Sequence, residues 1–93
     1  MLTKTVSTVS VAKPQEGLFI VTYNLVLKDN DVEKINRDFS GEYKPDQTTI
    51  TAVGVGIRNE MQKAIEKYKQ EKAIIENPQV ETARAAIEEN LEV

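Results

Sequence analysis

The sequence LFIVTYNLVLK, residues 18–28, shows the most regular pattern in the chain. Large apolar or aromatic side chains occupy every second position, which is the period of a β-strand with one face in the core. That face carries Phe19, Val21, Tyr23, Leu25 and Leu27. We therefore expect the rest of the fold to be built on this strand.

The opposite face of the same strand is more apolar than the solvated side of most antiparallel sheets. Leu18, Ile20 and Val26 lie on it, separated by Thr22 and Asn24. Exposed apolar patches usually mark contacts, so this face should be covered. The cover is either another copy of the protein or the C-terminal helix of the same chain.

Residues 2–13 predict a preceding strand, because β-branched and hydroxyl side chains dominate them. Val6 falls on the opposite parity from Val9 and Val11, which predicts a bulge near Ser7-Thr8. The segment Lys13–Gly17 then combines proline with glycine, as turns do. The two strands should form a hairpin.

A third strand is predicted after the polar break at residues 28–31, because Ile35, Phe39 and Tyr43 share one parity. Charged residues lie between them, as is typical of an edge strand. Short breaks between successive strands favour antiparallel neighbours. We therefore expect a three-stranded antiparallel β-meander over residues 1–43.

From residue 46 the apolar period changes to three and four residues, which predicts a long amphipathic α-helix over residues 46–76. Asp46 is its predicted N-cap. Gly54 and Gly56 would each cost about 1 kcal/mol relative to alanine inside this helix. We expect them to let the helix approach the sheet closely or to mark a local distortion. Residues 48–53 could instead form a fourth strand, with the helix beginning after Asn59.

Asn77-Pro78 should end this helix and begin a shorter C-terminal helix over residues 78–92, since proline suits a first helical turn. An apolar stripe follows on this helix, formed by Val80, Ala83, Ile87 and Leu91. The expected class is therefore α+β, with residues 1–93 in a single domain and the long helix packed on the core face of the second strand.

Composition excludes several classes of chemistry. The chain has 93 residues without cysteine or histidine, so disulfides, thiolate chemistry and the commonest general base and metal ligand are absent. Its formal net charge of −3 gives no general attraction to nucleic acid. No segment is long and apolar enough to span a membrane, and none resembles a signal peptide. We expect a cytoplasmic protein that is not an enzyme, with no cofactor and no metal.

Two segments resemble binding motifs only in part. Residues 54–59 read GVGIRN, but the third glycine of a dinucleotide-binding loop is replaced by Asn59. Residues 29–33 read DNDVE, but Lys34 stands where a calcium loop needs glycine. A hairpin turn in which Asp and Asn satisfy their own backbone explains the second segment more simply.

The functional hypothesis is a small interaction or assembly protein that forms a homo-oligomer through Leu18, Ile20 and Val26. A thin core at this chain length favours added burial between copies. A helix of about 30 residues would also be about 45 Å long and could extend beyond its sheet.

An alternative is a nucleic-acid-associated regulator, or a small accessory protein of a phage or another mobile element. Contacts to phosphate would come from the basic residues of the long helix, although interspersed glutamates oppose this. These residues are Arg58, Lys63, Lys67 and Lys69. A third class, an enzyme or ligand site, would need a pocket in which Tyr23 and Tyr43 or carboxylates converge, and the sequence alone indicates none.

Overall fold

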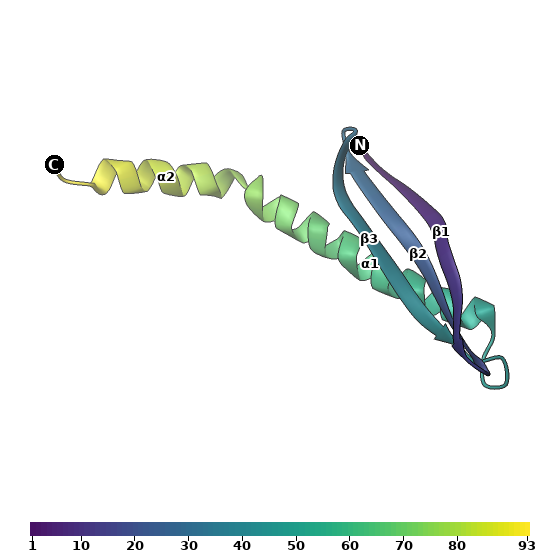
Figure 1. Cartoon of the computed structure of the whole chain (residues 1–93). Helices are drawn as coiled ribbons and strands as arrows, with labels where there is room; N and C mark the ends of the chain where they lie inside the picture. The colour runs from purple at the N-terminus through teal and green to yellow at the C-terminus, as the bar shows by residue number, and fades with distance from the viewer. The chain divides into compact units, whose positions relative to one another are not determined.

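The computed structural model describes residues 1–93, which form two compact units, Met1–Lys63 and Ala64–Val93. The first unit contains β1 (Leu2–Gln15), β2 (Leu18–Asp29), β3 (Val32–Tyr43) and the start of α1 (Ile50–Ile75). The rest of α1 and α2 (Pro78–Asn90) belong to the second unit. The predicted α+β class, with a three-stranded antiparallel sheet followed by helices, is confirmed (Figure 1).

The three strands follow one another in the sheet in the order β1-β2-β3, so the meander is confirmed. A short turn at Gly17, whose φ is 73°, joins β1 to β2. Asn30 and Asp31 form a two-residue turn between β2 and β3, with φ of 50° and 66°. Positive φ at both central residues matches the right-handed twist of a hairpin, and Asn and Asp adopt it more readily than most residues. The DNDVE segment, residues 29–33, therefore contains this hairpin turn, as predicted.

Both outer strands contain register shifts. β1 has a second shift between Ala12 and Gln15, and its first shift lies between Thr8 and Ser10, one residue beyond the predicted bulge. It places Val6 opposite Leu25 and Val11 opposite Val21, so two valines of opposite parity reach the same face. The shift in β3 skips Lys34. It has the corresponding effect of aligning the odd-numbered residues of β3 with those of β2.

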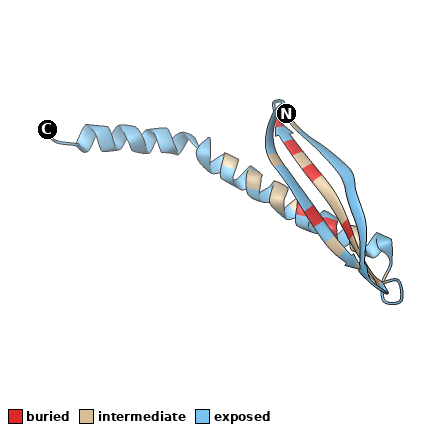
Figure 2. Ribbon diagram, viewed as in Figure 1, coloured by how far each residue is buried: buried red, intermediate tan, exposed pale blue.

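The core lies between this face of the sheet and α1 (Figure 2). Its buried side chains are Val21, Leu25, Leu27 and Phe39 from the sheet, and Ile57 and Met61 from α1. Phe19 and Tyr23 on the same face are half-buried. Burial stabilises each such side chain by about 1.5–3 kcal/mol. The predicted packing is therefore confirmed for the start of α1, which lies in the first unit, and the core is small.

The helix begins at Ile50 rather than at residue 46. Residues Lys44–Gln47 instead form a turn, in which the Lys44 carbonyl accepts the amides of Gln47 (2.9 Å) and Thr48 (3.0 Å). Thr49 is the N-cap, because its hydroxyl accepts the amide of Ala52 at 3.1 Å. The predicted cap at Asp46 is therefore wrong, and so is the alternative of a strand over residues 48–53.

Close approach of α1 to the sheet depends on Gly41 and not on the helix glycines. A Cβ atom placed on Gly41 would lie 2.7 Å from a methyl carbon of Val53 and 3.1 Å from one of Ile57. The same atom placed on Gly54 or Gly56 would meet nothing within 4 Å. The interpretation of the helix glycines as close-packing residues is therefore wrong.

The predicted boundary between the helices is confirmed at Asn77-Pro78. The side chain of Asn77 accepts the amide of Gln79 at 2.9 Å, and Pro78 occupies the first turn of α2. Proline costs nothing there because the amide it lacks has no partner within the helix. The helix ends at Asn90, two residues before the predicted end.

Replacing Gly41 with alanine should lower the free energy of unfolding by about 1–3 kcal/mol, since the new methyl group overpacks the contact with Val53 and Ile57. Replacing Gly56 with alanine should raise it by about 0.5–1 kcal/mol, because alanine loses less backbone entropy in a helix. Urea denaturation followed by circular dichroism measures both. A destabilising Gly56→Ala would mean that this glycine has a packing role that the fold does not show.

Candidate functional site

The sheet face turned away from α1 is polar along its middle. The hydroxyls of Thr22 and Ser40 share a hydrogen bond of 2.7 Å. Asn24 donates from its amide to Asn36 at 2.8 Å and to Asp38 at 2.9 Å. These side chains link β2 to β3 across the face, which we call the polar face.

The three residues predicted as an interface lie on this polar face and are half-buried. Leu18 and Ile20 are neighbours on it, whereas Val26 lies beyond Thr22 and Asn24, about 20 Å from Ile20 along the strand. Ile20 pairs with Ala12 and Glu42 on either side. The face therefore has apolar residues at both ends of β2 and no continuous apolar patch.

An apolar cavity of about 340 Å³ lies on the opposite, core face, at the end of the sheet near the start of α1. Val11 and Ile50 at its rim are 62% and 56% exposed. The lining residues are Val11, Phe19, Val21, Tyr23, Tyr43 and Ile50.

The sequence pattern does not indicate this cavity, yet Tyr23 and Tyr43 both line it. Tyr43 pairs with Phe19 across β2 and β3, with ring centroids 6.0 Å apart and an angle of 37° between the planes. No acid, amine or hydroxyl other than the phenols lines the cavity. Such a surface can hold an apolar or aromatic group, as interface anchors do.

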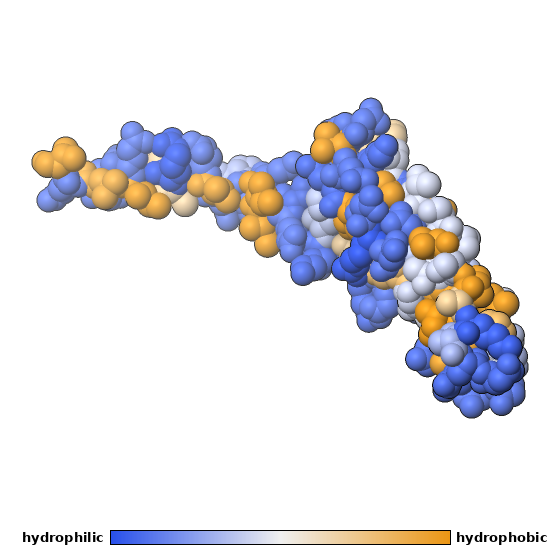
Figure 3. Space-filling model, viewed as in Figure 1, coloured by the Kyte–Doolittle hydropathy of each residue, from blue (hydrophilic) through white to orange (hydrophobic).

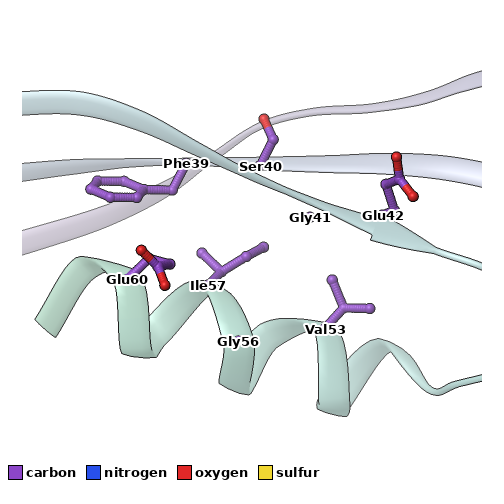
Figure 4. Close-up of a pocket in the computed structure, with 8 residues that line it drawn as sticks. All are labelled: Phe39, Ser40, Gly41, Glu42, Val53, Gly56, Ile57 and Glu60. Carbon is purple, nitrogen blue, oxygen red and sulfur yellow. The ribbon is translucent and has the colours of Figure 1, made fainter. Parts of the chain in front are cut away.

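A second cavity of about 280 Å³ lies between β3 and α1 (Figure 4). Ser40 and Glu42 are among the residues that border this cavity. Their side chains, however, point to the other side of the strand, away from Val53 and Ile57. Glu60 is therefore the only carboxylate on the helix side of this cavity. A single carboxylate beside apolar residues does not make an acid–base pair.

The four basic residues proposed to contact nucleic acid do not form a continuous stripe. Arg58 and Lys63 are separated by five residues, or about 140° around the helix. Lys67 and Lys69 are separated by two residues, or about 200°. Lys63 pairs with Glu60 at 3.1 Å, and Lys69 pairs with Glu66 at 3.8 Å. Glutamate side chains therefore lie beside the ammonium groups of Lys63 and Lys69.

The stripe predicted on α2 is exposed along its whole length. Val80 is 55% exposed, Ile87 61% and Leu91 69%, and no residue of α2 is buried. Arg84 pairs with Glu81 and Glu88 on another side of the helix. The helix therefore separates an apolar side from a charged side, as the surface of α2 in Figure 3 also shows.

No group of three or more acidic side chains is placed to hold a metal ion, and neither helix has the length and apolar content needed to cross a bilayer. No protein-family model, curated protein or solved structure matches this chain.

Replacing Thr22 and Asn24 together with valine should make the protein self-associate further than the unmodified chain, because the change joins Ile20 and Val26 into one apolar strip. Valine suits a strand, so the fold should remain. Static light scattering over a range of concentrations measures the change. An unchanged mass and solubility would show that the polar residues of this face do not limit association.

Proposed function

We propose that this protein is a non-catalytic assembly protein whose copies associate with one another, with α2 supplying part of the contact. The observation that carries the proposal is the exposure of every residue of α2, including its apolar stripe. An amphipathic helix gains its stability by burying such a stripe. Val80 and Ile87 of this stripe are instead 55% and 61% exposed.

The length of α2 strengthens this argument. It has 13 residues, and isolated helices shorter than about 12–15 residues are marginal in water. Its N-cap and its ion pairs contribute modestly, about 1 kcal/mol for a cap and less for each exposed pair. Burial of Val80 and Ile87 would contribute about 1.5–3 kcal/mol for each side chain. Packing against another molecule is therefore the larger available source of stability.

The spacing of the stripe suits a helix-to-helix contact. Val80, Ala83 and Ile87 follow intervals of three and four residues, which place side chains on one seam. Two-stranded coiled coils favour β-branched residues at the first and third of these positions, with leucine between them, where this helix has alanine. A small Ala83 between them lets two helices approach closely.

The same surfaces support an assembly role over catalysis or nucleic-acid binding. The larger cavity offers apolar and phenolic groups and no carboxylate. The basic residues of α1 point in different directions and lie among glutamates. On the polar face, Leu18, Ile20 and Val26 lie at the two ends of β2. There they can extend an interface, but they do not form its centre.

The direct test is the mass of the protein in solution, measured by light scattering on a sizing column over a wide range of concentrations. We expect a dimer that dissociates on dilution, with the helical circular dichroism signal falling in parallel as α2 loses its partner. A monomer at all concentrations, with unchanged helicity, would overturn the proposal. Binding to DNA or RNA that weakens as the salt concentration rises would instead favour the alternative function, a nucleic-acid-associated regulator.

Replacing Ile87 with glutamine should raise the Kd of self-association by about tenfold or more, since each 1.4 kcal/mol of lost burial is about a factor of ten. The matched control is Glu89→Gln, which changes the same helix on another side and should leave the Kd within about twofold. Equal effects of both variants would show that the apolar stripe is not a contact.

A further inference from the structure

The two edges of the sheet differ in how well they are protected against pairing with another chain. β3 carries five charged side chains along 12 residues: Glu33, Lys34, Arg37, Asp38 and Glu42. β1 carries only Lys4 and Lys13 along 14 residues that are otherwise rich in threonine, serine and valine. Charged residues are the usual protection of an edge strand, and long uncharged edges favour pairing. β1 is therefore the open edge.

The hairpin turn fixes which backbone groups of β1 point outward. Asp29 and Val32 flank the two-residue turn, so their backbone groups bond to each other. Asp29 then points away from β1, which makes its pair with Leu2 a non-hydrogen-bonded pair. The hydrogen bond of 3.1 Å from the Asn30 amide to the Met1 carbonyl agrees with this assignment. It shows that the backbone of Met1, one residue before Leu2, points inward. Alternation along the strand turns the backbone groups of Leu2, Lys4, Val6 and Thr8 outward.

We propose that β1 pairs antiparallel with β1 of a second copy, over Leu2–Thr8, to form a continuous six-stranded sheet across a two-fold axis. This inference specifies the contact within the proposed function and depends on it. The register shift after Thr8 ends the regular segment, and the segment is symmetric about Thr5.

The symmetric register suits the side chains of this segment. Centred on Thr5, it places Leu2 opposite the partner's Thr8 and Lys4 opposite the partner's Val6. The outward backbone groups of each chain then meet those of the other, and no lysine faces a lysine. Thr5 faces the partner's Thr5, and paired threonines on neighbouring strands stabilise sheets.

The difference between the edges also sets the size of the assembly. A contact between β1 and β3 of successive copies would continue without limit, whereas a contact between two β1 edges uses the one open edge of each copy. Because the outer edges of the resulting sheet are both charged β3 strands, the assembly closes as a dimer.

The test compares Val6→Pro with Glu42→Pro. Each proline removes one amide that points away from the sheet, so edge strands tolerate both changes. Val6→Pro should raise the dimer Kd by at least about tenfold, and Glu42→Pro should leave it within about twofold, with circular dichroism showing that both variants fold. Equal effects of the two variants, or none from Val6→Pro, would overturn the pairing.

Hydrogen exchange of the unmodified protein provides a test that needs no variant. The amides of Lys4, Val6 and Thr8 should exchange at least about tenfold more slowly at concentrations where the dimer forms than after dilution to the monomer. A dimer in which these amides exchange at the same rate would refute the β1 contact and leave the assembly proposal standing. A chain that is always a monomer would remove both.

Discussion

The contact between α1 and the sheet at Gly41 is the constraint on which the rest of the fold depends. Val53 and Ile57 lie where a side chain on β3 would otherwise stand. The missing side chain lets the helix sit close to β3, and Ile57 and Met61 of the helix are buried, as are Leu25 and Leu27 of the sheet. Since packed interiors lose stability even for one added methyl group, the position tolerates little else. One small residue on a strand thus sets the distance between the two layers.

The same contact explains why so much apolar surface remains outside the core. One helix covers β2 and β3, while Val6 and Val11 on β1 stay 54% and 62% exposed on the same face of the sheet. The apolar cavity lies at the end of this incompletely covered face. Burial between copies is a common way for small domains to complete such a core.

The parts of the fold that the sequence predicts are those decided by local period and turn chemistry. The alternation in β2, the hairpin at Gly17 and the change of period after residue 46 all appear in the structure. The predicted start of the helix is wrong because the Lys44 carbonyl accepts two amides and so forms a turn over Lys44–Gln47. Thr49, which follows this turn, is then the residue that caps the helix. The meeting of Tyr23 and Tyr43 was missed for a different reason. It depends on the register shift at Lys34, and without that shift Phe19 would pair with Glu42 rather than Tyr43.

The register shifts also bear on the contact that we propose between two copies. In β3 the shift turns Phe39 and Tyr43 inward and leaves Asp38 and Glu42 on the polar face. In β1 the shift brings Val11 to the cavity and leaves a regular, nearly uncharged segment before it. Without this bulge the open edge would have continued as far as the second shift at Ala12, and longer open edges favour uncontrolled pairing. The bulge limits the open edge to a short segment that can match its own copy, and a short self-matching edge favours a closed dimer over a fibre.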